Sequence, residues 1–154
     1  MRILDVAVEH VMTLNPAFIA DDATLQEAAG LMVDGGFRHL PVVDADRHVI
    51  GVLSERELRG KLGVEVERFP EAGSDILEER VEALMRPDPI TVGAKVRLGE
   101  VMAILEDERI GAIPVVDGAE RLVGIVSYVD VLRFVRDQDP RSSERMASSA
   151  SVRG

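Results

Sequence analysis

In the first half of the chain, the pattern of apolar and polar positions changes in a fixed order. A short apolar run after a proline, at 17–20, predicts an extended segment, and apolar residues at helical spacing over 25–32 predict an amphipathic helix. Two runs rich in β-branched residues, at 40–43 and 49–53, enclose the polar stretch DADRH and predict a β-hairpin. A second helix follows from about Ser54. The pattern therefore predicts the order β-α-β-β-α.

The second half of the chain repeats this order at a constant offset of 73 positions. The offset places residues 41–44 on 114–117, both reading PVVD, and Ser54 on Ser127, without a gap. The corresponding runs lie at 90–92, 98–105, 113–116 and 122–126, and a helix follows from Ser127. Such a match indicates internal duplication. One copy is too small to bury its sheet alone, so we expect the two copies to pack with pseudo-twofold symmetry into one α/β (α+β) domain.

Two segments fall outside the duplicated parts. We place the first copy at 6–60 and the second at 80–136, which leaves a connecting insert at 61–79 and a tail at 137–154. The insert has Gly and Pro at loop positions, and Ser74 is a candidate N-cap of a short helix. The tail is polar and Ser-rich, and we predict that it is disordered.

Composition and charge exclude several classes of function. Aromatic residues make up 3% of the chain and the net charge is −10, which disfavours a base-stacking surface and nucleic acid as the main partner. The chain has no cysteine, so disulfides, thiol catalysis and cysteine metal sites are excluded. The N-terminal stretch is charged throughout and no apolar run is long enough for a membrane span. We therefore expect a soluble, cytoplasmic protein without a membrane partner.

Candidate binding chemistry lies where the second helix of each copy begins. Ser54 with Glu57, and Ser127 with Asp130, stand at Ser-x-x-acid spacing where a strand gives way to a helix. A helix N-terminus has unpaired N–H groups and a partial positive charge, which suit a phosphate, and a nearby carboxylate can accept hydrogen bonds from a ribose. The same spacing is also that of a capping box. From local sequence, capping and binding are equal alternatives.

The duplicated phrases resemble the CBS domain, named after cystathionine β-synthase. The resemblance is carried by VMTLNP and GFRHLPVVDADRHVIGVLSEREL in the first copy and by LMRPDPITV and RIGAIPVVDGAERLVGIVSYVDVL in the second. Two tandem copies look like a CBS pair, or Bateman module. The resemblance implies two βαββα repeats and a regulatory module that often binds adenosine-containing ligands. It also implies dimerisation into a disc of four repeats.

The resemblance further implies a ligand site in the cleft between the repeats. In nucleotide-binding CBS domains, a Ser and an Asp at these places bind phosphate and ribose, and we carry those roles over to Ser127 and Asp130. Glu57 is one methylene longer than the family's Asp. We therefore expect the second copy to provide the better site, ahead of Ser54 and Glu57.

Further candidates follow from the same resemblance. Arg38 and His39 form a basic pair that would face ligand phosphates, together with nearby Arg109. The equal alternative is a solvated Arg and a hydrogen-bonded His at a strand edge. The residues that would wall an adenine are Ala17, Phe18, Ile90 and Thr91. Their alternative is a first strand packed on the core. His10 and His48 are isolated and lack metal-ligand spacing, so we predict no metal site.

The expected function is a regulatory module and not an enzyme, because no catalytic motif is present. No cofactor is required, and the candidate ligands are AMP, ADP, ATP, an NAD-type dinucleotide and S-adenosylmethionine. We expect a homodimer formed through the helices after Ser54 and Ser127, whose output is an effector protein or its own assembly state. The alternative is a ligand-free dimeric scaffold.

Overall fold

Both repeats fold in the predicted order. The computed structural model describes residues 2–141. The first repeat consists of β2 (Ile19–Ala20), α1 (Leu25–Gly35), β3 (His39–Val43), β4 (Val49–Ser54) and α2 (Glu55–Leu62). The second consists of β6 (Val92–Gly93), α4 (Leu98–Asp107), β7 (Ala112–Val116), β8 (Leu122–Ser127) and α5 (Tyr128–Asp137). The predicted β-α-β-β-α order and both antiparallel hairpins are confirmed.

Local sequence explains the limits of α1. The hydroxyl of Thr24 accepts a hydrogen bond from the backbone N–H of Glu27 (3.2 Å), and the Glu27 carboxylate accepts one from the N–H of Thr24 (3.1 Å). This capping box satisfies two backbone donors that the first turn leaves free. At the other end Gly36 takes a φ of 69°, the left-handed region that glycine adopts without a Cβ clash.

Each sheet takes its fourth strand from the segment that precedes the other repeat. β1 (Thr13–Leu14) pairs antiparallel with β8, and β5 (Arg86–Pro87) pairs antiparallel with β4. The strand orders are β2-β3-β4-β5 and β1-β8-β7-β6. Residues 13–14 therefore belong to the second sheet, although the duplication assigns them to the first copy. The unit of packing differs from the unit of duplication.

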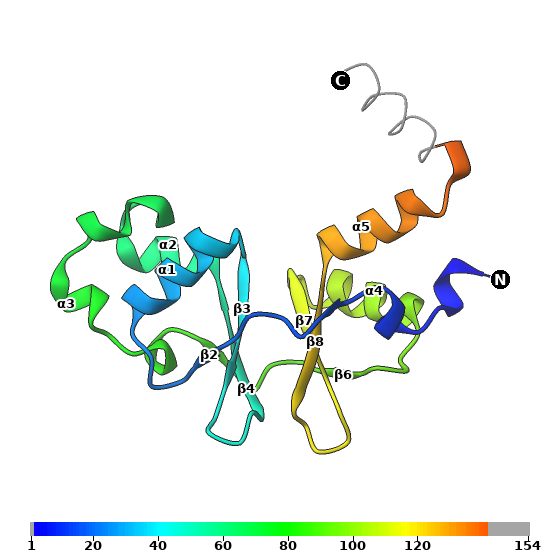
Figure 1. Cartoon of the computed structure of the whole chain (residues 1–154), viewed down its shortest axis with the longest axis horizontal. Helices are drawn as coiled ribbons and strands as arrows, with labels where there is room; N and C mark the ends of the chain where they lie inside the picture. Colours follow the sequence, from blue (N-terminus) through cyan, green and yellow to red (C-terminus); the bar gives the residue numbers. More distant parts are fainter. Residues whose placement is uncertain (1, 142–154) are drawn as a thin grey trace.

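The two hairpins lie side by side with their turns at the same end of the molecule (Figure 1). The backbone N–H of Val49 donates to the carbonyl of Glu120 (3.3 Å), and that of Leu122 donates to the carbonyl of Arg47 (3.2 Å). Each repeat thus donates one of these two bonds, and together they join the two hairpin turns with pseudo-twofold symmetry.

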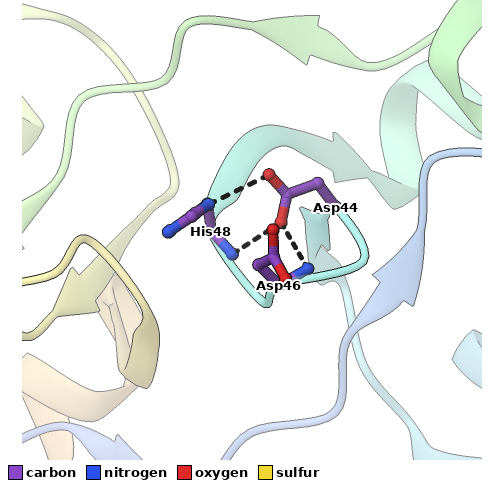
Figure 2. Close-up of side chains that lie close together, drawn as sticks. All are labelled: Asp44, Asp46 and His48. Carbon is purple, nitrogen blue, oxygen red and sulfur yellow. Dashed lines mark hydrogen bonds and ion pairs between the residues drawn. The ribbon is translucent and has the colours of Figure 1, made fainter.

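An aspartate closes each hairpin turn. Asp44 Oδ1 accepts hydrogen bonds from the backbone N–H groups of Asp46 and His48 (both 2.9 Å), and Asp44 Oδ2 lies 3.1 Å from His48 Nδ1 (Figure 2). Asp117 accepts two backbone bonds in the same way in the second hairpin. Partial burial acts to raise the pKa of Asp44, but the hydrogen bonds from His48 and Asp46 hold it below its ordinary value. The prediction that His48 is isolated is wrong, because the turn brings it onto Asp44.

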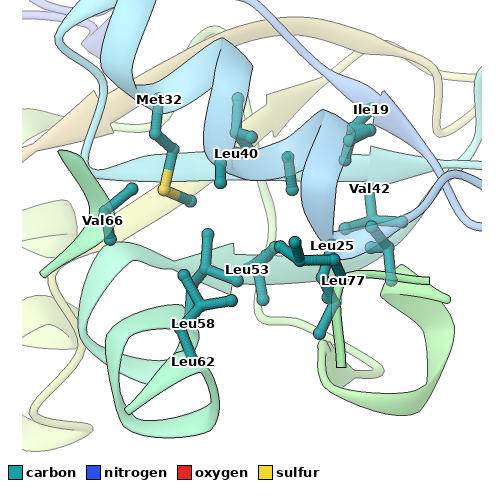
Figure 3. Packing of buried hydrophobic residues seen from close by; sticks show 13 residues of the cluster. Ile19, Leu25, Met32, Leu40, Val42, Leu53, Leu58, Leu62, Val66 and Leu77 are labelled. Atoms are coloured by element: carbon teal, nitrogen blue, oxygen red, sulfur yellow. The ribbon is translucent and has the colours of Figure 1, made fainter. Parts of the chain in front are cut away.

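Two hydrophobic cores lie against the two sheets. The first is filled by side chains of the first repeat and of the insert (Figure 3). Its buried members are Ile19, Leu25, Ala28, Ala29, Met32, Leu40, Val42, Leu53, Leu58, Leu62, Val66, Leu77 and Val81. The second core contains no insert, and Val6, Val8 and Val11 from the N-terminal segment pack into it instead. The predicted insert is therefore part of the first core.

The segments outside the strands and the longer helices contain short helices. These are the 3-10 helices η1 (Ile3–Asp5), η2 (Val8–His10), η3 (Val66–Glu71) and η4 (Val81–Ala83), and the single-turn helix α3 (Ser74–Leu77). The prediction that Ser74 is an N-cap is wrong. Gly73 precedes the helix and its carbonyl accepts from the N–H groups of Ile76 and Leu77 (both 3.0 Å), so Ser74 is already helical.

The predicted disordered tail starts at residue 137, which the structure places in α5. Asp137 is the last residue of α5, and the N–H of Gln138 donates to the carbonyl of Phe134 (3.2 Å). The rest of the predicted disordered tail, from residue 142 on, lies outside the described residues. Within residues 2–141, none of the helices has the length and apolar character needed to span a membrane.

Candidate ligand-binding cleft

A cleft of about 800 Å³ opens beside the N-terminal end of α2. Both repeats line it, and we call it the central cleft. Its lining residues are His39, Val52, Ser54, Arg56, Glu57, Arg86, Asp88, Pro89, Ile90, Glu108, Arg109, Ile110, Gly111, Ala112 and Tyr128. The first repeat contributes the hairpin and α2, and the second contributes the segment after β5, the junction from α4 to β7, and the start of α5.

Five of the eleven predicted site residues line the central cleft: His39, Ser54, Glu57, Ile90 and Arg109. The other ten lining residues are not among the predicted site residues, and they include Arg56, Arg86 and Tyr128. Arg86 falls on Thr13 at the offset of 73, but only the fold shows that Thr13 lies beside Asp130, so the sequence alone carried no signal for Arg86.

The other six predicted residues lie outside this cleft. Arg38 lines a smaller groove of about 390 Å³ beside α1 and α2, Ala17 packs against the first core, and Thr91 is half-buried. Phe18 is exposed, and the guanidinium of Arg47 lies 5.1 Å from its ring centroid. Ser127 caps α5, and Asp130 lies in its first turn.

Ser54 caps α2 while it faces the central cleft. Its hydroxyl oxygen accepts from the N–H of Glu57 (3.1 Å), and its proton is donated to Glu57 Oε1 (2.8 Å). Within the described part of the chain, Glu57 Oε2 receives no hydrogen bond. Ser54 therefore caps α2 while one carboxylate oxygen of Glu57 stays available to a ligand in the cleft.

Asp130 is engaged by the chain itself at both oxygens. Oδ2 accepts from the N–H of Ser127 (2.9 Å) and from its hydroxyl (3.0 Å), which completes a capping box. Oδ1 accepts from the hydroxyl of Thr13 in β1 (3.1 Å). The Asp130 carboxylate therefore ties the N-terminal segment to the start of α5. The equivalent of Thr13 in the other repeat is Arg86, which makes no hydrogen bond to Glu57 within residues 2–141.

His39 begins β3 and its half-buried ring reaches the second repeat. A Cβ atom on Gly111 would lie 2.5 Å from His39 Nε2, so the glycine provides the space that the imidazole occupies. Burial lowers the pKa of His39, and Glu57 acts in the opposite direction. The ring is therefore neutral at pH 7.

The lining of the central cleft contains three carboxylates, Glu57, Asp88 and Glu108, and three arginines, Arg56, Arg86 and Arg109. No ion pair joins any of these arginines to a carboxylate within residues 2–141. A guanidinium presents its N–H groups in a planar fork that matches phosphate oxygens. The cleft thus combines free guanidinium groups with a helix N-terminus, two features that suit an anionic ligand.

The turn around Asp44 brings three potential metal-ligating side chains together. Potential ligand atoms of Asp44, Asp46 and His48 lie within 4.8 Å of one another. Asp44, however, uses both oxygens to close the hairpin turn (Figure 2), as Asp117 uses one in the other repeat without a histidine. Turn closure accounts for this cluster, and we propose no metal there.

The sequence was compared with family models and with known proteins. The model of the CBS domain matches residues 8–63 and 81–137. A CBS domain-containing protein of Dictyostelium discoideum is 29% identical over 84% of this chain and 90% of its own length. Protein MJ1232 of Methanocaldococcus jannaschii is 25% identical over 92% of this chain and 42% of its own length. An inosine-5′-monophosphate dehydrogenase of Rhizobium tropici is 31% identical over 94% of this chain but only 28% of the enzyme.

Solved structures agree with the sequence matches. A Vibrio cholerae protein designated AcuB is 29% identical, with a TM-score of 0.73 over 88% of this chain and 93% of that one. CBSX2, crystallised in complex with AMP, is 26% identical, with a TM-score of 0.71 over 84% of this chain and 95% of that one. The two family matches coincide with the two βαββα repeats, and the chain therefore belongs to the CBS domain family as a CBS pair.

Proposed function

We propose that this chain is a regulatory module that binds an adenosine-containing ligand in the central cleft and acts on a partner protein, without catalysis of its own. The observation that carries this proposal is that the cleft lining contains apolar side chains together with arginines that form no ion pair within residues 2–141. The apolar residues are Val52, Ile90 and Ile110, and the arginines stand beside three carboxylates of the lining, Glu57, Asp88 and Glu108. A nucleotide likewise carries a base that packs against apolar surface and phosphates that bind cationic groups. The complex of the related CBSX2 with AMP supports this ligand class.

Within this proposal, the N-terminus of α2 and the three arginines bind the phosphate. Glu57 accepts hydrogen bonds from the ribose through Oε2, the oxygen that Ser54 leaves free. This assignment departs from the sequence-based expectation that Ser127 and Asp130 form the better site. We prefer the Ser54 side because Asp130 already accepts three hydrogen bonds from the chain. We therefore propose one ligand per chain.

Thermal-shift screening followed by calorimetric titration tests this function. The compounds are AMP, ADP, ATP, an NAD-type dinucleotide and S-adenosylmethionine, each against the full chain. A ligand that binds only the folded state raises its stability by about 2.7 kcal/mol at a hundredfold excess over Kd. We expect at least one compound to do so, with one molecule bound per chain. No stabilisation by any of them would reject the proposal.

A second candidate function, a ligand-free dimeric scaffold, is favoured by the surface of α5. Three apolar side chains of this helix that lie outside the cleft lining are 40–68% exposed: Val129, Leu132 and Val135. Figure 1 shows α5 projecting away from the hairpins. Exposed apolar area of this kind marks an interaction surface, and a self-complementary patch forms a twofold interface. We propose that a second copy covers it, in either function.

The sequence-based prediction placed both post-hairpin helices in the dimer interface. α2 offers no comparable surface, because its leucines, Leu58 and Leu62, are buried in the first core. The proposed interface therefore rests on α5 alone. A monomer mass by light scattering at working concentrations would reject it.

A further inference from the structure

We infer that Tyr128 is a specificity-determining residue of the central cleft, on whose ring the base of the ligand stacks. This inference rests on the proposed function and extends it, because it concerns the part of the ligand that the arginines and Glu57 do not contact. The residue lies at the boundary between the two repeats. It is the first residue of α5 in the second repeat, yet it lines the cleft into which the N-terminus of α2 points.

Tyr128 is held in place by one backbone and one side-chain hydrogen bond. Its backbone N–H donates to the carbonyl of Gly111 (3.3 Å), and its hydroxyl donates to the carbonyl of Leu105 (3.1 Å). The residue is nevertheless 47% exposed. Because the hydroxyl is already bonded to α4, the ring itself is the part left for a ligand. A tyrosine has few rotatable bonds, so an anchored ring loses little entropy on binding.

The Tyr128 ring suits a base better than a phosphate. A phenol ring carries no charge, and the two groups that fix the residue are neutral backbone carbonyls, those of Leu105 and Gly111. Tyr128 is also the only Phe, Tyr or Trp side chain in the lining of the central cleft. A nucleobase stacks on an aromatic face irrespective of its hydrogen-bonding pattern. The ring therefore selects ligands that carry a planar base.

The two repeats differ at this position. The residue equivalent to Tyr128 at the offset of 73 is Glu55, which begins α2. A carboxylate at that place offers no surface for stacking. This difference agrees with one ligand per chain, bound on the Ser54 side.

A single tyrosine makes the test direct. The full chain contains one Tyr and no Trp, so its intrinsic tyrosine fluorescence reports on Tyr128 alone. AMP is titrated into the parent, into Tyr128→Ala and into Tyr128→Phe, and binding to each is measured by calorimetry. The tyrosine fluorescence of the parent is recorded in parallel. Free tyrosine amide in the same AMP solutions corrects this fluorescence for absorption by AMP. Arg133→Ala, an exposed position of α5 outside the cleft lining, is the matched control. Ribose 5-phosphate is the probe without a base.

We expect AMP to quench the fluorescence saturably, with the calorimetric Kd. Tyr128→Ala should raise the Kd for AMP by between about 5-fold and 150-fold, and Tyr128→Phe and Arg133→Ala should keep the parent's value. The affinity for ribose 5-phosphate should be the same in all four proteins. Melting curves confirm that each variant is folded.

Other results would overturn the inference. If AMP binds the parent but Tyr128→Ala binds it equally well, or if the fluorescence does not change, the base lies elsewhere and the proposed function still stands. If Tyr128→Phe loses as much affinity as Tyr128→Ala, the bond to Leu105 matters and the ring does not. If no adenosine-containing compound binds the parent, the proposed function and this inference fall together.

Discussion

Two acids at equivalent positions of the two repeats should respond differently to removal. Glu57 lines the central cleft and has one oxygen free, whereas Asp130 accepts hydrogen bonds from Ser127 and Thr13 at both oxygens. Glu57→Ala should therefore weaken ligand binding, and Asp130→Ala should weaken the fold. The pair is matched, because both acids stand three residues after the serine that caps their helix.

The size of each effect follows from the bonds that are lost. A hydrogen bond to a charged group contributes about 1.5–3 kcal/mol, so Glu57→Ala should raise the Kd for AMP by roughly tenfold to a hundredfold. Ser54 would still cap α2, because its hydroxyl accepts from the backbone N–H of residue 57. Asp130→Ala removes part of a capping box and the bond to Thr13, which together stabilise the fold by about 2 kcal/mol. That loss corresponds to a Tm about 4 to 8 °C lower.

Calorimetric titration with AMP and urea denaturation, carried out on the parent and both variants, measure the two effects. The reasoning is refuted if Asp130→Ala keeps the parent's stability and loses affinity while Glu57→Ala binds AMP normally. That result would move the ligand to the Ser127 side of the molecule.

Three further predictions concern single residues. Burial holds the folded-state pKa of His39 below 6.5, so the unfolded chain binds this proton more readily, and the free energy of unfolding should fall as pH drops from about 7 through this region. Urea denaturation at several pH values should show a smaller fall for His39→Gln, and an identical pH dependence in the parent and the variant would contradict this. Gly111→Ala should displace the His39 ring and weaken AMP binding, whereas Gly118→Ala, where a Cβ meets nothing within 4 Å, should not; equal titration curves for both variants would count against the assigned contact. Leu132→Glu should convert a dimer into a monomer by light scattering, because it places a charge in the proposed interface; a dimer mass in this variant would exclude α5 from the interface.

The duplicated hairpins and helices could be predicted because their signals are local. Residues 40–43 and 49–53 are rich in β-branched residues, and an aspartate stands at the turn that joins them. Turn chemistry and periodicity act over a few residues, so they are visible without knowing the partner surface. The starts of α2 and α5 followed from Ser54 and Ser127, which the structure confirms as N-caps.

The exchanged strands could not be predicted in the same way. β1 and β5 contain two residues each, which is too short for any periodicity, and their partners lie in the other repeat. His48 was misjudged for a related reason. Its contact with Asp44 depends on the backbone path of the turn and not on the spacing of metal ligands.

By itself, the sequence determined the two βαββα repeats, the acids that follow each capping serine, and the family to which they belong. Only the tertiary structure decided which acid is free. The Ser-x-x-acid spacing is the same in both repeats, but Thr13 reaches Asp130 from a strand 117 residues away, and its counterpart Arg86 does not bind Glu57. The structure likewise brought Tyr128 and Gly111 beside Ser54 and His39. Such contacts depend on how one repeat packs against the other, and packing between distant segments leaves no periodic signal along the chain.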